Sequence, residues 1–388
     1  MGGNLAGLFQ LDPEVAFLNH GSYGACPQVV FDAYQGFQRE LERQPVAFLE
    51  PSRGLTARLR AVRAAVAKEV GAAPEDLVGM TNATEALNIV AQSLALGPGD
   101  EVLTTDHEYA AMDKTWAHVC RRAGARIVVA EIPLPLRDAA AFTAALVARM
   151  TARTRVLFLS HVTSATALVF PLAEVLAEAR ARGIVSVVDG AHGPGLVPLA
   201  LDVLGADAYA GNCHKWWMAP KGAGFLHVRR GLQAQIVPLV ISHGWSADGA
   251  EPGPFGNSAF IDRLEMQGTR DPAAWLAVPA ALQFRAVQGW DAVARRCRDL
   301  AQEVAAEVAR ASGLPPLASA EFCAPQMVAL PLPECDTTAL KALLEARGVE
   351  VPCYRWKGQP LLRVSVQGYN DRADLDRLLA GLRDVFGW

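Results

Sequence analysis

The sequence lacks the features that mark disulfide-stapled, membrane-spanning and nucleic-acid-binding proteins. Its seven cysteines are odd in number and form no C-x-x-C pair, so they predict neither a zinc knuckle nor a disulfide framework. No stretch approaches the ~18 uninterrupted apolar residues of a membrane span. The 36 basic and 40 acidic residues give a net charge of −4 without a run of Lys and Arg. Nucleic acid and membrane surfaces are therefore not expected partners, and no metal site is expected.

The N-terminus also lacks a targeting pattern. Met1-Gly2-Gly3-Asn4 is not a basic segment followed by an apolar core, so the sequence predicts a cytoplasmic protein. The same residues resemble a myristoylation start, but Ala6 stands where that motif requires Ser or Thr. The chain contains no internal repeat and no low-complexity tract.

The length and composition predict a globular protein of more than one domain. At 388 residues the chain exceeds one small core and suggests a large domain with one or two smaller ones. An apolar fraction of 51% with 20% charged residues is typical of a folded α/β protein and argues against disorder. A chain of this size can bury a sizeable site.

From about residue 77 to residue 228, short β-rich runs alternate with helical stretches, as a parallel sheet with crossover helices requires. Ala-rich amphipathic runs at Ala139–Met150 and Pro171–Arg182 supply covering helices. This pattern predicts an α/β fold whose large domain contains a mostly parallel seven-stranded sheet. The predicted strands are Leu77–Met80, Glu101–Thr104, Arg126–Glu131, Arg155–Ser160, Ile184–Val188, Ala206–Ala210 and Gly222–Val228.

The rest of the chain predicts a smaller α+β C-terminal domain. We expect residues 1–50 to contribute to that domain and to the active site, residues 51–270 to form the large domain, and residues 271–388 to form a connecting helix and the small domain. The other expected elements are a helix at Leu55–Val70 closed by Gly71, an irregular turn at Asn19–Gly24, a Gly- and Pro-rich loop at Ser242–Gly268, helices at Pro272–Val287, Ala292–Ala311 and Asp371–Val385, and strands at Met327–Leu330 and Leu361–Val366.

The strongest chemical feature is a lysine at the predicted mouth of the sheet. Lys215 follows the strand that ends near Ala210, in Ala210-Gly211-Asn212-Cys213-His214-Lys215-Trp216-Trp217, where open α/β proteins bind ligands. A lysine in such a place can form a Schiff base with an aldehyde. An isolated lysine is far more often an ordinary solvated residue, so the interpretation depends on its neighbours.

A carboxylate ends the apolar strand that precedes the lysine segment. Asp189, in Val187-Val188-Asp189-Gly190-Ala191-His192, suits a partner for the protonated pyridine nitrogen of pyridoxal 5′-phosphate (PLP), because a buried carboxylate raises the pKa of that nitrogen. Alone, Asp189 could simply cap the following turn, and His192 could be a core histidine.

A third element is a strand-to-helix turn rich in small and hydroxylic residues. It comprises Met80-Thr81-Asn82-Ala83-Thr84-Glu85. The free N–H groups and the positive end of the helix suit a phosphate, and the Thr84 hydroxyl adds a donor. A capping box without a ligand explains this piece equally well.

Together these motifs resemble the class V aminotransferase family of fold-type I PLP enzymes. The resemblance runs from about Phe17 to the end and also includes Arg363-Val364-Ser365 with Tyr369-Asn370. Within the family, the chain is most similar to isopenicillin N epimerase-like proteins. The motifs for that similarity are Phe17-Leu18-Asn19-His20-Gly21-Ser22-Tyr23-Gly24, Asp106-His107-Glu108-Tyr109 and Leu362-Arg363-Val364-Ser365.

The resemblance implies a role for each site residue. Lys215 is the Schiff-base lysine, Asp189 binds the pyridine nitrogen, and His107 stacks on the ring face opposite the lysine. His192 and Ser164 lie near the phenolic oxygen of PLP. The phosphate is held by Ala83, Thr84, Asn212 and His214, and by Thr269 of the other subunit, which implies a homodimer with a shared active site. The residues implied in binding an amino acid substrate are Asn19, Tyr23 and Arg363.

Arg363 is supported by its surroundings as well. It stands in an apolar, strand-like run where an unpaired charge would be costly, and its guanidinium fork fits a carboxylate bidentately. The alternative is a surface salt bridge.

Two departures weaken the similarity to cysteine desulfurases. Ser164 stands where those enzymes carry an Asn, and the spacing of Cys353 to Arg363 does not match their loop cysteine. The aromatic residues Trp216, Trp217, Trp245 and the Tyr354-Arg355-Trp356 segment, on predicted loops, suit either a bulky substrate side chain or plain packing.

The sequence predicts the reaction family better than the reaction. Removal of the Cα proton by the lysine is a shared first step. Epimerisation then needs a proton donor on the opposite face, where His107 or Tyr109 could stand. Because the resemblance places the His107 imidazole on that face, His107 is the expected catalytic donor. The favoured function is an epimerase, with a C–S lyase or cysteine desulfurase-like enzyme and a class V aminotransferase as alternatives. A non-catalytic PLP-fold binding module is the remaining alternative, although it would not need an aldehyde trap.

Overall fold

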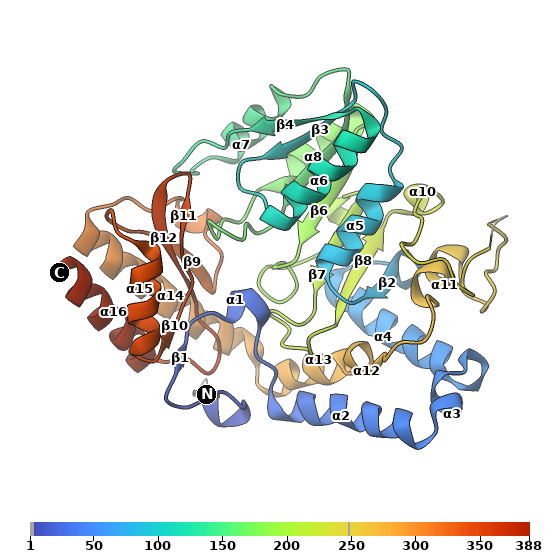
Figure 1. The fold of residues 1–388 in the computed structure, drawn as a ribbon, viewed down its shortest axis with the longest axis horizontal. Coiled ribbons are helices and arrows are strands. Elements are labelled where there is room, and N and C mark those ends of the chain that lie inside the picture. The colour runs from blue at the N-terminus through green and yellow to red at the C-terminus, as the bar shows by residue number, and fades with distance from the viewer. Residues whose placement is uncertain (1–3, 247–248) are drawn as a thin grey trace.

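The computed structural model describes residues 4–246 and 249–388. The chain folds around a large seven-stranded sheet and a smaller C-terminal sheet (Figure 1). The Met1–Asn4 motif lies largely outside the described residues, as do two residues of the predicted loop at 242–268. Among the described helices, none is both long and apolar enough to cross a bilayer.

The large sheet has the strand order β2-β8-β7-β6-β5-β3-β4. The five strands from β7 to β4 run parallel, whereas β8 is antiparallel to both β7 and β2. The central strands are buried on both faces because helices cover both, as their continuous apolar runs require. The predicted mostly parallel seven-stranded sheet is thus confirmed. Its strands are β2 Leu77–Met80, β3 Glu101–Thr105, β4 Arg126–Ala130, β5 Thr154–Ser160, β6 Val185–Gly190, β7 Ala208–Asn212 and β8 Gly224–Val228.

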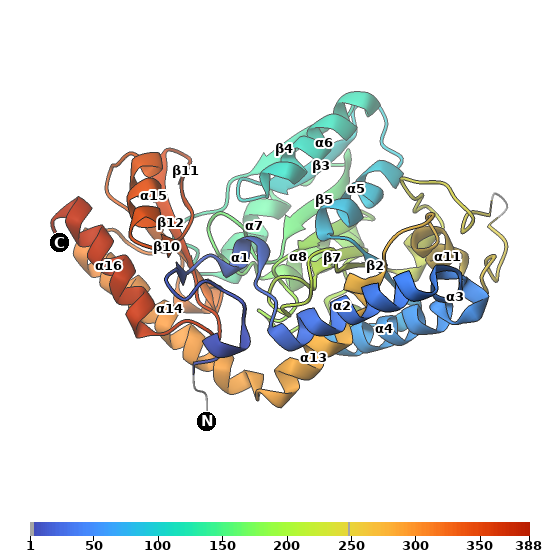
Figure 2. The same ribbon diagram turned by 60° about the horizontal axis from the view of Figure 1, so that its bottom comes forward.

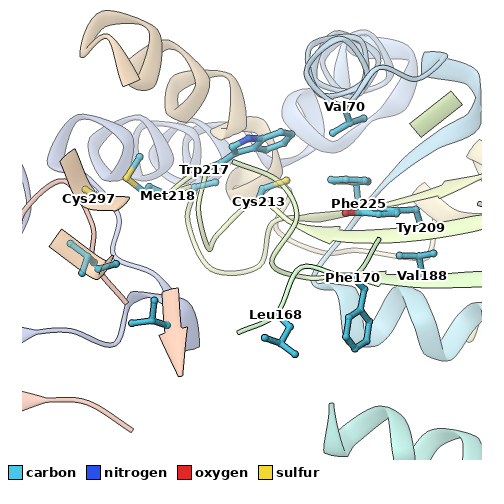
Figure 3. Close-up of a cluster of buried hydrophobic side chains, with 14 of the residues drawn as sticks. Val70, Leu168, Phe170, Val188, Tyr209, Cys213, Trp217, Met218, Phe225 and Cys297 are labelled. Atoms are coloured by element: carbon cyan, nitrogen blue, oxygen red, sulfur yellow. The ribbon is translucent and has the colours of Figure 1, made fainter. Parts of the chain in front are cut away.

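Alternate residues of each strand enter two different cores. In β3, Val102 joins the core beneath α5 and α6, and Leu103 joins the core on the other face, as the two-residue period of a strand requires. Figure 3 shows part of the second core, where Val188 and Tyr209 of the sheet lie on the same side as Val70 of α4. Helices α2, α4 and α13 lie together along this face (Figure 2). The helices around the large sheet are α4 Leu55–Val70, α5 Ala83–Ser93, α6 Ala110–Ala123, α7 Ala139–Val147, α8 Leu172–Ala181, α9 Leu201–Leu204, α10 Arg230–Gln233 and α11 Ala259–Glu265.

The smaller sheet is antiparallel, with the order β11-β12-β9. The N-terminal strand β1 (Ala16–Phe17) pairs in parallel with β10 (Val349–Glu350), so the first residues lie beside the C-terminal part of the chain. The other elements of the C-terminal part of the chain are β9 Met327–Pro331, β11 Cys353–Trp356, β12 Gln359–Ser365, α14 Trp290–Ser312, α15 Thr337–Ala346 and α16 Arg372–Phe386. The residue bounds predicted above for the three domains stay a prediction.

The remaining helices connect these two layers. The expected single helix at Pro272–Val287 is divided into α12 (Ala273–Leu276) and α13 (Val278–Val287), because Pro279 has no N–H to continue the hydrogen-bond ladder. The N-terminal helices are α1 His20–Tyr23, α2 Gln28–Arg43 and α3 Pro45–Leu49. No element was predicted over residues 28–43, where α2 packs on α12 and α13.

Three local predictions are wrong. The irregular turn at Asn19–Gly24 contains α1, a single helical turn too short to leave a periodic pattern. The loop at Ser242–Gly268 contains α11, whose Phe260, Ile261 and Leu264 enter the core. Tyr354–Trp356 lies in strand β11 rather than in a loop. It forms a hairpin with β12 through a two-residue turn in which Lys357 and Gly358 both have positive φ.

Candidate active site

The site lies at the carboxyl ends of neighbouring strands. Asp189 near the end of β6 pairs with Ala210 of β7, and Lys215 follows β7 by three residues. Because the two strands are parallel, their carboxyl ends meet at the same edge of the sheet. The N-terminus of α5 reaches the same edge, since the Ala83 N–H donates to the side-chain oxygen of Asn212 at 2.8 Å.

The Lys215 amine lies in a partly buried position against a histidine. Its Nζ is 3.0 Å from His192 Nε2, and His192 Nδ1 accepts the Trp216 indole N–H at 3.2 Å. Burial and the positive charge of Arg363 lower the pKa of Lys215 to about 7, although the Asp189 carboxylate opposes the shift. A lysine with this pKa supplies a nucleophilic amine near neutral pH.

Asp189 is a buried carboxylate without a cationic partner. It is 5% exposed and accepts the Ala191 N–H at 2.9 Å, so it does cap the following turn. Burial raises the pKa of Asp189, whereas the Ala191 N–H and the Lys215 charge lower it. Among the described ion pairs, none includes Asp189. A capping role therefore leaves room for a positively charged ligand.

Arg363 on β12 is the complementary case, a buried guanidinium without a carboxylate. It is 6% exposed. Its Nη1 donates to the Ser164 carbonyl oxygen at 2.6 Å and the Ser164 hydroxyl at 3.2 Å, and its Nη2 donates to the Ser22 hydroxyl at 2.9 Å. Its Nε has no acceptor in the described part of the chain. Because burying an unpaired charge is costly, this guanidinium is suited to an anionic ligand.

The N-terminal segment that contains Asn19 and Ser22 belongs to the same hydrogen-bond network as Arg363. The Ser22 hydroxyl donates to Asn19 Oδ1 at 2.5 Å, and Asn19 Nδ2 donates to Glu350 at 3.0 Å. A glycine is required at position 24, where φ is 72° and a Cβ would collide with the His214 carbonyl oxygen. The N-terminal segment therefore lies directly on the lysine loop. Tyr23, in contrast, is 74% exposed in the single chain.

The start of α5 is capped by its own residues and still leaves donors. Asn82 accepts the Glu85 N–H at 2.9 Å, and Glu85 in turn accepts the Thr81 N–H at 3.3 Å. The capping interpretation is therefore observed. The phosphate role stays a prediction that this capping permits, because Thr84 is exposed in the first turn of the helix, where N–H groups lack partners within the helix.

His214 faces the same region with a defined tautomer. Its Nδ1 lies 3.1 Å from the Ala223 carbonyl oxygen, which can only accept, so the neutral ring presents an unprotonated Nε2. Burial and the Lys215 charge lower the pKa of His214 to about 4, partly offset by the Ala223 hydrogen bond. His214 can donate to a phosphate oxygen only after the phosphate charge has raised this pKa.

The structure encloses His107 and exposes Tyr109. His107 is 1% exposed, its Nδ1 is 2.7 Å from the Thr166 hydroxyl, and its ring lies 4.6 Å from the Trp356 ring. Burial lowers the pKa of His107 to about 4, against the effect of the Asp106 charge, so the imidazole is neutral at neutral pH. Tyr109 is 45% exposed, and its phenol lies close enough to influence the pKa of Arg363. The stacking role of His107 stays a prediction.

Thr269 lines a cavity whose described walls do not include Lys215. It is exposed on this cavity of about 480 Å³, whose lining also includes Thr81, Gly222, His243 and Trp275. Thr81 precedes the cap of α5, so the cavity opens beside the predicted phosphate region. The predicted contribution of Thr269 to a partner subunit stays a prediction.

Sequence reasoning gave no role to two residues that hold the lysine backbone. His20 Nε2 donates to the Lys215 carbonyl at 2.9 Å, and His20 Nδ1 lies 2.9 Å from the Tyr369 hydroxyl. Burial lowers the pKa of His20 to about 3. Both residues stood in the quoted motifs, but no spacing indicates that they meet. Trp216, for which both a substrate-site wall and plain packing were considered, is fully buried, and its indole N–H donates to His192.

Comparison with known proteins agrees with the sequence motifs. The family described as aminotransferase class-V matches residues 17–378. The isopenicillin N epimerase of Streptomyces clavuligerus is 39% identical, over 98% of this chain and 97% of its own. The putative L-cysteine desulfhydrase 1 of Oryza sativa subsp. japonica is 32% identical, over 94% of this chain and 82% of its own.

A solved structure shares the fold. A C-DES mutant with glycine covalently linked to its PLP cofactor superposes with a TM-score of 0.79, at 23% identity, over 96% of this chain and 97% of that one. The fold-type I architecture expected from the sequence is confirmed by this similarity.

Proposed function

Because the chain belongs to the class V aminotransferase family of PLP-dependent enzymes, we propose that it binds PLP through Lys215 and epimerises an amino acid at Cα. The observation that carries the proposal is the pair of buried, uncompensated charges at Asp189 and Arg363, both of which act on the Lys215 amine. A packed protein core does not keep such charges apart without a ligand to join them.

The residues present fit the cofactor. Lys215 offers an amine with a pKa of about 7, Asp189 an anionic partner for the pyridine nitrogen, and the start of α5 with Asn212 a place for the phosphate. Ser164 and His192 complete the proposed cofactor site, with Thr84, His214 and Thr269 at the phosphate. Bound PLP supplies the electron sink that makes the Cα proton of an amino acid removable.

The chain's own groups then bind the substrate and move its proton. The free Nε and the Nη atoms of Arg363 fix the α-carboxylate, and Ser22 and Ser164 hold that guanidinium in place. Asn19 accepts the Ser22 hydroxyl and is also a proposed substrate contact. Tyr23 stays in the proposal as a substrate contact. The neutral amine of Lys215 removes the Cα proton on one face. For inversion, a second group must return a proton on the other face.

The geometry favours Tyr109 over His107 for the second face. A proton donor must carry a proton at working pH, and the pKa of His107 is lowered to about 4. The His107 ring is also packed against Trp356 and Phe170. Tyr109 offers a phenolic O–H on an exposed side chain that lies close enough to Arg363 to influence the pKa of that guanidinium.

Thiol chemistry separates the epimerase proposal from a cysteine desulfurase. A desulfurase needs a reactive thiolate, but burial raises the pKa of Cys353 to about 12, and Cys353 is fixed in β11 opposite Leu362. Burial also raises the pKa of each of the other six cysteines. A C–S lyase needs no thiolate, and the similarity to a putative L-cysteine desulfhydrase keeps it as the second candidate.

An incubation in D₂O distinguishes the reactions. We expect an accepted amino acid to gain deuterium at Cα and to lose optical purity without releasing ammonia. Release of pyruvate, ammonia or sulfide would identify a lyase, and a stall until a keto acid is added would identify a transaminase. The matched α-amide of the substrate should react at least about tenfold more slowly, because it cannot form charged hydrogen bonds to Arg363.

Two variants assign the second face in the same assay. Tyr109→Phe should keep Cα exchange through Lys215 and lose inversion by roughly 10²- to 10⁴-fold, the usual contribution of a positioned acid. His107→Phe is the matched control and should invert at a near-normal rate. The opposite outcome would assign the second proton to His107.

We also propose a homodimer with a shared site. Tyr23 and Thr269 are exposed in the single chain, and Val237, Leu239, Val240 and Ile241 form an apolar run that is 44–56% exposed. Contiguous exposed apolar residues are typical of protein–protein contacts. Light scattering should give twice the chain mass, and Ile241→Asp should lower both the mass and cofactor retention. A fully active monomer would contradict this part of the proposal.

A further inference from the structure

The contact between Trp216 and His192 determines which nitrogen of His192 carries the proton. The Trp216 indole N–H can only donate, and it points at His192 Nδ1 from 3.2 Å. His192 is 2% exposed, and burial together with the charges of Lys215 and Arg363 keeps its pKa well below the usual value. The neutral ring must accept at Nδ1, so its own proton lies on Nε2.

This proton lies between His192 and the lysine. His192 Nε2 is 3.0 Å from Lys215 Nζ. An ammonium group has only donors and would place two N–H groups against each other, whereas a neutral amine has a lone pair that accepts the His192 N–H. We propose that Trp216 is a positioning residue that fixes the Nε2–H tautomer of His192, and that this N–H holds Lys215 as the neutral amine.

The other groups around Lys215 do not hydrogen-bond to its amine nitrogen among the described residues, so the contact with His192 decides the protonation state of the amine. Arg363 disfavours the ammonium and Asp189 favours it. His20 and His214 are both neutral, and His20 directs its Nε2–H to the Lys215 carbonyl rather than offering an acceptor. Lys221, whose charge reaches His20 and His214, adds a further positive charge nearby. The His192 N–H is thus the direct hydrogen-bond partner of the amine nitrogen among the described residues.

The inference rests on the proposed function in one respect: the neutral amine matters because capture of the PLP aldehyde requires an unprotonated amine. It explains why an indole is buried against the lysine loop, and why His192 and Trp216 belong to one hydrogen-bonded chain that ends at Nζ. Loss of the indole N–H would free His192 to take the other tautomer and to accept from an ammonium.

The test is the pH dependence of the Lys215 amine in the full chain after removal of cofactor. Trace acetylation with acetic anhydride, followed by peptide mass spectrometry, measures the fraction of neutral amine at each pH. Trp216→Phe keeps the aromatic ring and removes the N–H. We expect its labelling midpoint to rise by about one pH unit, and capture of added PLP at pH 7 to slow about fivefold, since the neutral fraction falls accordingly.

Two controls separate this role from packing. Trp217→Phe removes the neighbouring indole, which stacks near Phe225, and should leave the midpoint unchanged. Trp216→3-benzothienylalanine replaces only the N–H by sulfur in a ring of the same shape, so it should raise the midpoint even if Trp216→Phe folds poorly. His192→Gln can still accept from the indole and donate to the amine, and should keep the midpoint low.

An unchanged Lys215 midpoint in both Trp216 variants would overturn the inference, whatever happens to activity. If the unaltered chain shows a low Lys215 labelling midpoint but does not capture PLP, the result would instead contradict the proposed function. The two failures are therefore distinguishable.

Discussion

Lys215→Ala should lose the visible absorbance of bound cofactor together with turnover, while the protein keeps its fold. The lysine supplies both the covalent link and the proton transfer, so the expected loss of turnover is roughly 10³-fold or more. The fold should survive because, among the described residues, the side chain of Lys215 has one hydrogen bond, to His192, while its backbone carbonyl keeps the bond to His20. Absorbance spectra, circular dichroism and thermal melting measure these effects.

The melting temperature should stay equal or rise slightly, because the substitution removes a partly buried amine that loses hydration on folding. Lys221→Ala is the control, an exposed lysine six positions later, and should retain both absorbance and turnover. If Lys215→Ala retained the absorbance band and Lys221→Ala lost it, the cofactor would be bound by Lys221, which would contradict the assignment of Lys215.

Asp189→Asn should bind the cofactor and lose most of its activity. The amide keeps the shape of the side chain and can accept the Ala191 N–H, but it cannot stabilise a positive pyridine nitrogen. Removal of one partner of a buried charge pair is expected to lower turnover roughly 100-fold. The same change should also lower the labelling midpoint of Lys215 below about 7, because the Asp189 charge raises that pKa.

Asp207→Asn provides the control for this substitution. Asp207 is also buried, but it lies at the amino end of β7, where it accepts from Ser186 at 2.8 Å and from Arg229 at 2.6 Å. Its replacement should lower the melting temperature and leave the Lys215 midpoint unchanged. Near-normal turnover in Asp189→Asn would remove Asp189 from the mechanism.

The sheet could be predicted from sequence because its strands carry strong local patterns. β2 and β6, for example, are short apolar runs buried on both faces and followed by turn residues, and their predicted bounds lie within two residues of those observed. The location of Lys215 beyond β7 followed from that pattern together with the rule that ligands bind at the carboxyl ends of parallel strands.

The contacts that shape the lysine environment were beyond local patterns. The His20 bond to Lys215 spans 195 positions in the chain, and Arg363 meets Ser164 across 199. Each depends on how the N-terminal segment and β12 pack on the lysine loop. The tautomer of His192 depends on one indole N–H, and a sequence motif carries no information about its direction.

The choice between His107 and Tyr109 illustrates the same limit. Adjacent positions in Asp106-His107-Glu108-Tyr109 offered two candidates for the second face, and family resemblance favoured His107. Packing separates them, since Trp356, which lies 250 positions beyond Asp106 in a hairpin that was predicted as a loop, covers His107. The exposure of Tyr109 follows from the beginning of α6 at Ala110.

The most direct test of the account is to reduce the purified protein with borohydride and to locate the modified residue by peptide mass spectrometry. Reduction converts the C=N link between PLP and a lysine into a stable amine, so the label reports the attachment point without any assumption about substrate. We expect a phosphopyridoxyl group on Lys215 in each chain. A label on Lys221 or another lysine, or no label on a folded protein incubated with PLP, would contradict it.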